Sequence, residues 1–416
     1  MAEQHGKALV PQIRFAGFTD PWEQRKLSEL VEIERGGSPR PIERYITDDP
    51  CGLNWVKIGD APELGRYITQ TAEKIKPEGL AKTRQVYPGD LVLSNSMSFG
   101  RPYIMAIKGC IHDGWLLIRD AQKHFDPIFL CHMLGAPQML NQYRMFAAGS
   151  TVNNLNKELV EKAIVSLPSK DEQREIGIVL DRLDSLITLH QRKYDKLCVL
   201  KKSMLDKMFP KGGSLYPEIR FAGFTDPWEQ RKLGEIATFG GGHTPSMSDS
   251  DNYEGGNVLW VTSQDVKSHY LDGTTTQITE KGAKELTLYP AGSLVMVTRS
   301  GILRHTLPVA ELRKPSTVNQ DIRVILPQGK YYGQWLLQFF ISRNKELLLE
   351  FGKTGTTVES VDFSKMRDMV LLTPSLPEQQ QIGHYFARLD NLITLHQRKL
   401  ELLRNIKKSM LDKMFV

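Results

Sequence analysis

One segment of the sequence resembles part of a phosphate-binding loop, but its spacing is wrong. Phe351-Gly-Lys-Thr354 has the Gly-Lys-Thr ending of a loop that holds phosphates with its backbone amides and its lysine. That motif also requires a glycine five residues before its final glycine, and Leu347 occupies that position. The sequence also lacks the H-E-x-x-H, G-x-S-x-G, G-x-G-x-x-G and N-P-P-Y patterns. We therefore expect no catalytic residues, no metal site and no cofactor in this chain.

Composition restricts the class of protein only weakly. Lys and Arg number 54 against 48 Asp and Glu, giving a formal net charge of +6, which permits a nucleic-acid partner without requiring one. The four cysteines have no C-x-x-C spacing, so we expect reduced thiols rather than zinc ligands or disulfides. No apolar run approaches the roughly 18 residues of a membrane span, and the first residues lack a signal-peptide core. We expect a cytoplasmic protein with no membrane contact.

The chain consists of two copies of one unit. The block Pro11–Leu27 returns, with one residue changed, as Pro217–Leu233, at an offset of 206 residues (217 − 11). The block Leu186–Lys193 returns unchanged at the same offset. We call Pro11–Leu27 and Pro217–Leu233 the opening blocks. Two copies are too few for a solenoid, and they predict an internal pseudo-dimer with a pseudo-two-fold axis.

Each copy ends in a long helix with a heptad pattern. Apolar positions alternate by three and four residues through 180–208 and again through 386–414. A helix over Asp171–Phe209 would span roughly 58 Å. The simplest packing of two such helices in one chain is antiparallel. The predicted seam contains Leu183, Ile187, His190, Leu197, Leu389, Ile393, His396 and Leu403, with Lys201 and Lys407 also at core positions.

The region between the repeated ends differs strongly between the two copies. Short β-rich runs such as Leu91–Ser94 and Leu294–Thr298 are followed by helix-like stretches at Pro127–Phe146 and Tyr332–Glu350. The sequence therefore predicts an α+β fold: two mixed α/β domains joined by an antiparallel coiled coil. The predicted parts are a flexible tail (1–12), a first domain (13–167), a first helix with linker (168–212), a second domain (213–373) and a second helix (374–416).

These repeated motifs resemble the specificity (S) subunit of type I DNA restriction–modification systems. The resemblance covers nearly the whole chain. Its most specific parts are Phe18–Leu27 and Phe224–Leu233, the Trp-Val-x-x-x-Asp and Tyr-Pro elements, the Gly-Ser/Thr-Thr-Val turn, and the Pro…Glu-Gln sequence before each helix.

The resemblance implies a non-catalytic reader of DNA. The two divergent domains would be target recognition domains, each reading one half of a split, asymmetric site in double-stranded DNA. The coiled coil would set the distance between the halves, and the conserved regions would dock two methyltransferase subunits. Two restriction subunits would join that complex. S-adenosylmethionine, ATP and Mg would be bound by these partner subunits.

Candidate base-reading residues lie in small polar loops. Base edges in the major groove are read by paired donors and acceptors, such as Arg for guanine and Asn for adenine, whereas phosphates are held by Lys, Arg, Ser and Thr. Four loops are rich in such groups. Their candidate DNA-binding residues are Ser94, Asn95, Ser96, Ser98, Arg101, Ser150, Thr151, Asn153, Arg299, Ser300, Arg304, Lys353, Thr354, Thr356 and Thr357.

Two other functions compete with the DNA-reading subunit. A self-contained DNA methyltransferase or nuclease with its own reading domain would be active as the purified chain with a methyl donor or metal. A coiled-coil scaffold that binds only proteins would have no sequence-selective affinity for DNA, even with its partners present.

Overall fold

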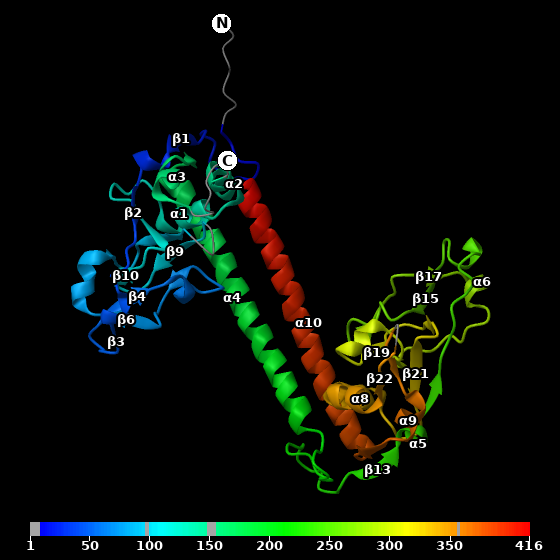
Figure 1. The fold of residues 1–416 in the computed structure, drawn as a ribbon. Coiled ribbons are helices and arrows are strands. Elements are labelled where there is room, and N and C mark those ends of the chain that lie inside the picture. The colour runs from blue at the N-terminus through cyan, green and yellow to red at the C-terminus, as the bar shows by residue number, and fades with distance from the viewer. Residues whose placement is uncertain (1–8, 96–99, 148–154, 356–357) are drawn as a thin grey trace. The chain divides into compact units, whose positions relative to one another are not determined.

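The computed structural model describes residues 9–95, 100–147, 155–355 and 358–416. The chain divides into two compact units (Figure 1). Unit 1 comprises Met1–Lys193 and His396–Val416, and unit 2 comprises Tyr194–Leu395. The two long helices, α4 (Lys170–Lys207) and α10 (Leu376–Lys413), each contribute one segment to unit 1 and one to unit 2. The predicted Asp171–Phe209 helix therefore exists, with its last turn ending two residues earlier.

Unit 1 contains two five-stranded sheets and one two-stranded sheet. The strands are β1 (Glu23–Lys26), β2 (Glu32–Arg35), β3 (Ile46–Thr47), β4 (Leu53–Val56), β5 (Tyr67–Ile68), β6 (Glu73–Ile75), β7 (Arg84–Val86), β8 (Leu91–Ser94), β9 (Pro102–Met105), β10 (Gly109–Ile111), β11 (Trp115–Arg119) and β12 (Ile164–Leu167). The strand orders are β3-β6-β4-β10-β7, β2-β11-β8-β9-β5 and β1-β12. Every residue of β8 is buried, which explains its uninterrupted apolar sequence.

The helices of unit 1 correct one prediction. The single helix-like stretch predicted over Pro127–Phe146 is two helices, α1 (Pro127–Leu134) and α2 (Pro137–Ala147). Pro137 has no N–H to donate and its ring clashes with the preceding turn, so it starts a new helix instead of continuing α1. A short helix, α3 (Lys157–Glu161), precedes β12.

Unit 2 repeats one of the two five-stranded sheets of unit 1. Its strands are β13 (Glu229–Lys232), β14 (Ala237–Gly240), β15 (Val258–Val261), β16 (Tyr270–Leu271), β17 (Gln277–Ile278), β18 (Leu294–Val297), β19 (Val309–Leu312), β20 (Thr317–Val318), β21 (Ile322–Pro327), β22 (Gly352–Lys353), β23 (Ser360–Val361) and β24 (Val370–Thr373). The order β14-β21-β18-β19-β16 corresponds to β2-β11-β8-β9-β5, and β13-β24 corresponds to β1-β12. Smaller sheets have the orders β17-β15-β20 and β22-β23.

The helices of unit 2 also divide where one was predicted. The stretch Tyr332–Glu350 forms α7 (Gly333–Ser342) and α8 (Asn344–Phe351). The Asn344 side chain accepts hydrogen bonds from Leu307 N at 3.1 Å and Thr306 Oγ1 at 3.0 Å, so tertiary contacts fix the start of α8. The remaining helices are α5 (Leu233–Ile236), α6 (Glu280–Ala283) and α9 (Phe363–Asp368).

The long helices pack antiparallel within unit 1, where the start of α4 lies beside the end of α10 (Figure 1). His190 of α4 contacts His396 of α10. Asp184, which lies six residues before His190, contacts Lys407, which lies eleven residues after His396. The two helices therefore run in opposite directions. The predicted seam residues are buried or half-buried, whereas Leu186 and Leu189 are 42% and 46% exposed. Tertiary contact, rather than apolar character alone, therefore decides which leucines are covered.

A histidine pair occupies the seam of unit 1. The Nδ1 atoms of His190 and His396 are 2.7 Å apart, a distance that requires one ring to donate and the other to accept. Burial lowers the pKa of both imidazoles, and the nearby cations Lys193 and Lys399 lower it further, as His190 does for His396. Because the folded pKa is below the ordinary value, the pair contributes stability that is present above about pH 6.5 and is lost as the pH falls.

We expect the thermal midpoint of the chain to fall as the pH is lowered from 7.5 to 5. The double variant His190→Leu, His396→Leu removes both titrating rings, so its midpoint should decline less over the same range. Differential scanning calorimetry at matched ionic strength measures both curves. Equal declines for the variant and the unmodified chain would show that this pair does not titrate against folding.

Candidate nucleic-acid interface

Each opening block is joined to the first turn of a long helix by a buried ion pair. In unit 1, Arg14 donates from Nε and Nη2 to the two carboxylate oxygens of Glu172, both at 2.7 Å. In unit 2, Arg220 makes the same two 2.7 Å bonds to Glu378. The glutamate side chains are at most 1% exposed. A bidentate ion pair fixes both the distance and the relative orientation of the two side chains. The repeated residues therefore attach the opening block to the long helix in the same way in both units.

The adjacent glutamines connect the long helices to the divergent domains. Gln173 Oε1 accepts from Asp126 N at 2.8 Å, just before α1. Gln379 Oε1 accepts from Tyr332 N at 2.8 Å, just before α7. The sequence suggested only a helix start at Glu-Gln. In the structure, the two glutamine side chains bind the residues that precede α1 and α7. These partners are distant in the sequence, so the sequence alone did not indicate this role.

The residues that directly follow one long helix complete the core around the opening block of each unit. Phe415 packs edge-on against Trp22 in unit 1, with ring centroids 6.4 Å apart. Phe209 packs edge-on against Trp228 in unit 2, with centroids 6.0 Å apart. The repeated Met-Phe ending therefore belongs to the hydrophobic core of each unit. Together, the opening blocks and the long helices form what we call the framework.

A framework carboxylate binds a donor from each divergent domain. In unit 1, Asp184 of α4 pairs with Lys407 of α10 and accepts from Arg66 Nε at 2.7 Å. In unit 2, Asp390 of α10 pairs with Lys201 of α4 at 2.6 Å and accepts from Tyr270 Oη at 3.1 Å. The Asp–Lys pair is repeated, whereas the donor differs, so unlike domains are attached to the same framework site.

Burial makes these attachments sensitive to loss of the carboxylate. The side chains of Arg66 and Asp184 are each 13% exposed, and that of Lys407 is 17% exposed. Burial and the neighbouring Arg66 lower the pKa of the Lys407 ammonium. In unit 2, burial and the Asp390 charge raise the pKa of the Tyr270 hydroxyl, which keeps it protonated as a donor.

About half of the candidate DNA-binding residues lie outside the described part of the chain. These are Ser96, Ser98, Ser150, Thr151, Asn153, Thr356 and Thr357. The remaining candidates are described, and a backbone hydrogen bond links the segment after β8 or β18 to a residue distant in sequence in each unit. Leu155 N donates to Asn95 O at 2.9 Å in unit 1, and Val361 N donates to Thr298 O at 2.8 Å in unit 2. The described residues Leu155 and Val361 therefore contact the segments that follow β8 and β18.

Two of the candidates in unit 1 are buried. Ser94 is 0% exposed and its Oγ accepts from Arg101 N at 3.0 Å. Asn95 is 5% exposed and its Nδ2 donates to Asp113 O at 2.8 Å. Both side chains shape the base of the loop, and contact of either with DNA stays a prediction. Arg101 is exposed, and its guanidinium donates to Glu63 O at 2.6 Å and lies over the Tyr103 ring.

The candidates in unit 2 surround the hairpin β22–β23. Arg299 is exposed and forms a backbone bridge with Ser360, and Ser300 N donates to Glu359 O at 3.1 Å. The Arg304 guanidinium holds the pKa of the Glu359 carboxyl below its ordinary value. The other two described candidates, Lys353 and Thr354, are exposed. Lys353 forms an ion pair with Asp362 at 2.8 Å.

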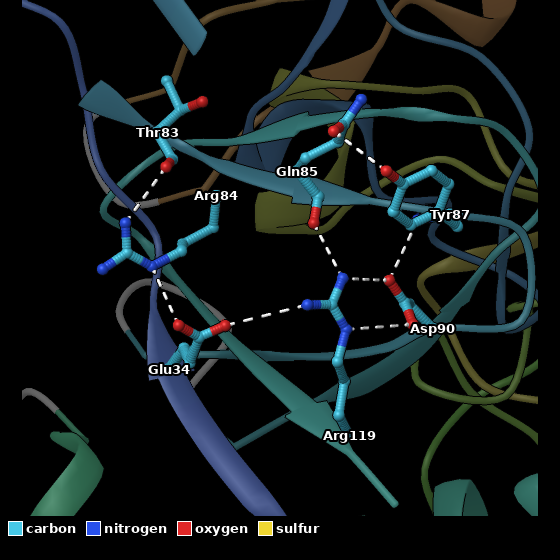
Figure 2. A network of polar contacts seen from close by, with 7 residues as sticks. All are labelled: Glu34, Thr83, Arg84, Gln85, Tyr87, Asp90 and Arg119. Atoms are coloured by element: carbon cyan, nitrogen blue, oxygen red, sulfur yellow. Dashed lines mark hydrogen bonds and ion pairs between the residues drawn. The ribbon is translucent and has the colours of Figure 1, made fainter. Parts of the chain in front are cut away.

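Not every arginine on these domains is available to a ligand. Figure 2 shows Arg119 of β11 between the carboxylates of Asp90 and Glu34, at 2.9 Å and 3.8 Å. Arg84 of β7 donates to the same Glu34 at 3.2 Å. Because β7 belongs to one sheet and β2 and β11 to the other, this network joins the two sheets of unit 1. Its arginine charges are matched by carboxylates, so we assign it a structural role.

The described residues contain neither a candidate metal site nor a candidate membrane span. Within ranges 9–95, 100–147, 155–355 and 358–416, no group of three or more His, Cys, Asp or Glu side chains has the geometry to hold a metal ion. In the same ranges, no helix is both long and apolar enough to cross a membrane.

Comparison with known proteins identifies both copies of the repeat. A family model described as "Type I restriction modification DNA specificity domain" matches residues 19–198 and again residues 225–405. Each match covers part of one opening block, one divergent domain and most of one long helix. The two matches together include most of the chain.

Curated relatives are named specificity subunits of type I restriction enzymes. The chain is 30% identical over 191 residues to the EcoR124I/EcoR124II specificity subunit of Escherichia coli. That alignment covers 43% of this chain and 47% of the relative, so the chain matches about half of that protein's length. It is 21% identical over 418 residues to the MjaVIII specificity subunit of Methanocaldococcus jannaschii, covering 94% of this chain and 92% of that one.

A solved structure shows a similar fold. The S subunit of a type I restriction-modification system from M. genitalium superposes with a TM-score of 0.59 at 14% identity. The superposition covers 98% of this chain and 99% of that chain.

Proposed function

Because the chain belongs to the type I restriction modification DNA specificity domain family, we propose that it is the DNA-reading subunit of a restriction–modification complex. The observation that carries this proposal is the double family match on a chain whose framework is repeated and whose two domains diverge. Domains that face different bases are free to differ, whereas a framework that binds the same partner twice must stay alike. The two domains would therefore read unlike half-sites of a split site in double-stranded DNA.

The long helices would set the distance between the half-sites. Helix α4 has 38 residues, which corresponds to a length of about 57 Å. Helix α4 pairs antiparallel with α10 within unit 1. The buried ion pairs at Glu172 and Glu378 attach each opening block to its own long helix. In DNA readers with two-fold symmetry, the separation of the two reading elements determines the half-site spacing.

The exposed leucines of the long helices support docking of the same partner on both units. Leu186 and Leu189 of unit 1 are 42% and 46% exposed. Their repeat equivalents in unit 2, Leu392 and Leu395, are 44% and 46% exposed. Contiguous exposed apolar surface marks protein-binding sites, and a partner that docks on both units would contact the same repeated leucines. We propose that two methyltransferase subunits bind here, that they carry S-adenosylmethionine, and that two restriction subunits with ATP and Mg join them in the cytoplasm.

The decisive experiment combines co-purification with mapping of methylated bases. The chain is co-expressed with the methyltransferase subunit of the same system, and genomic methylation is read by long-read sequencing. One split motif with unlike halves is the expected result. Methylation by the purified chain alone would instead support a self-contained enzyme. A stable complex with no sequence-selective DNA binding would support a scaffold.

We expect Arg101→Ala and Arg299→Ala to weaken specific binding by the assembled complex. Each arginine is exposed in a predicted reading loop, and a bidentate contact to a base edge contributes about 1–3 kcal/mol, which corresponds to on the order of 10-fold in affinity. Fluorescence anisotropy with a duplex that carries the mapped site measures the change. Arg192→Ala, on the exposed surface of α4, is the control. Unchanged affinity in both loop variants would exclude these loops as readers.

A further inference from the structure

A groove in unit 1 lies between the divergent domain and the long helices. It has a volume of about 660 Å³. One wall comes from residues 63–66, 100–102 and 135–140 of the domain, and the other from α4 and α10. Five cationic side chains line it: Arg66, Arg101, Arg404, Lys407 and Lys408.

Three of these cations are not matched by a carboxylate. Arg66 and Lys407 pair with Asp184. Within the part of the chain that the structure describes, Arg101, Arg404 and Lys408 form no ion pair: Arg101 donates to a backbone carbonyl, Arg404 donates to Gln191 Oε1 at 3.0 Å, and Lys408 is exposed. Glu63 is the other carboxylate in the groove lining. This differs from the Arg84–Arg119 network of Figure 2, where carboxylates match the arginines.

Unit 2 contains an equivalent groove of about 1010 Å³. Its helix wall includes the repeat equivalents of the unit 1 residues: Lys201 and Lys202 correspond to Lys407 and Lys408, and the uncharged Cys198 stands at the position of Arg404. Its domain wall supplies Lys267 and Lys345 and the histidines His269 and His305. Its carboxylates, Asp390, Asp206 and Glu346, each take part in an ion pair, with Lys201, Lys211 and Arg343.

The second groove therefore also has three cations without a carboxylate partner. Among the described residues, Lys202, Lys267 and Lys345 form no ion pair. Lys202 is the repeat equivalent of Lys408. Lys267 and Lys345 come from the divergent domain, at positions unrelated in sequence to Arg101. The sequences of the two divergent domains differ strongly, but each domain contributes positively charged side chains to the groove beside the long helices.

Position connects both grooves to the predicted reading loops. Arg101 belongs to the loop after β8 and also lines the unit 1 groove. His305 and Thr306 line the unit 2 groove directly after Arg304 of the loop after β18. A ligand held by a reading loop would therefore continue into the adjacent groove.

We propose that each groove binds the phosphate backbone of the DNA next to its half-site. The inference rests on the proposed function. The two domains differ in sequence, but both grooves carry positive charge, which suggests that both grooves bind the same ligand. The phosphate backbone is the part of DNA that is the same at both half-sites. Lys and Arg side chains without carboxylate partners suit phosphates, which position a protein on DNA without specifying sequence.

The test measures the salt dependence of DNA binding by the complex of the full chain with its methyltransferase. The variant Arg404→Gln, Lys408→Gln removes two charges from the unit 1 groove. Dissociation constants are measured from 50 to 300 mM NaCl with a duplex carrying the mapped site and with a scrambled duplex. Each lost phosphate contact lowers the slope of log K against log salt by about 0.9, so the slope should fall by about 2 on both duplexes. The ratio of specific to scrambled affinity should stay within about 2-fold, because phosphate contacts carry no sequence information.

The control removes the same charge elsewhere. Arg192→Gln, Arg398→Gln changes two exposed arginines that line neither groove, so its slope should match that of the unmodified complex. Lys202→Gln, Lys267→Gln repeats the test independently in unit 2. An unchanged slope in both groove variants, or an equal loss in the control, would overturn the proposal. Loss of methyltransferase co-purification would overturn it too, because the grooves would then belong to a protein interface.

Failure of the proposed function would give a different result. The unmodified complex would then bind the mapped and scrambled duplexes equally, whatever the groove variants did to the salt slope.

Discussion

Replacing Glu378 by Ala should lower the free energy of unfolding by about 3–5 kcal/mol, because removing one partner of a buried ion pair leaves the other without compensation. Glu378 accepts both 2.7 Å bonds from Arg220 and one bond from Trp228 Nε1 at 3.4 Å. The side chain of Arg220 is 15% exposed, so water can solvate it only in part. Urea unfolding of the full chain, followed by tryptophan fluorescence and circular dichroism, measures the change.

Two further variants make that prediction specific. Glu229→Ala removes a carboxylate from an exposed pair with Arg231 and should leave stability almost unchanged. The double variant Glu378→Leu, Arg220→Met removes both charges and should be more stable than Glu378→Ala alone. If Glu378→Ala behaved like Glu229→Ala, the ion pair would not be what joins the opening block to α10.

Replacing Asp184 by Ala should be at least as damaging in unit 1, with an expected loss of about 3–5 kcal/mol or more. The change leaves two buried cations, Arg66 and Lys407, facing each other without their shared carboxylate. Because Arg66 belongs to the divergent domain and the other two residues to the helices, we expect the domain to loosen from the helices. Hydrogen exchange measured by mass spectrometry should show faster exchange in β5 and in the facing turns of α4 and α10.

Tyr270→Phe in unit 2 provides the matched comparison. It removes only the hydrogen bond to Asp390 and keeps the Asp390–Lys201 pair and the ring beneath Arg313. The expected loss is about 1 kcal/mol. Equal effects of Asp184→Ala and Tyr270→Phe would mean that the framework carboxylate does not balance the buried cations of unit 1.

The attachment of each domain to a framework carboxylate bears on whether one domain could be exchanged for another. The framework supplies the same Asp–Lys pair twice, and each domain brings its own donor, Arg66 or Tyr270. A replacement domain would need one donor at the start of the β5 or β16 strand to attach in the same place. Near-identical sequences on either side of each domain would permit exchange of domains by recombination. Comparison of the coding DNA of the two copies would test recent exchange, since strong synonymous divergence would argue against it.

The sequence by itself determined the duplication, the two long helices and the buried strands. These features leave a local or periodic signal: an offset of 206 residues, a heptad pattern through 180–208, and the apolar run that became β8. The β-run predicted at Leu91–Ser94 matches β8 residue for residue. The stretches Pro127–Phe146 and Tyr332–Glu350 were each predicted as one helix, and the structure divides both.

Only the tertiary structure decided how these parts act together. Glu172 and Arg14 are 158 residues apart in the chain, and their pairing leaves no periodic signal. The same is true of the loops that meet after β18 and of the grooves, whose walls come from distant segments. Burial also separated candidates of similar type, because Ser94 and Asn95 are enclosed by backbone hydrogen bonds whereas Arg101 and Arg299 are exposed. Contacts between residues far apart in the sequence depend on packing, and packing is specified by the whole chain rather than by any one stretch of it.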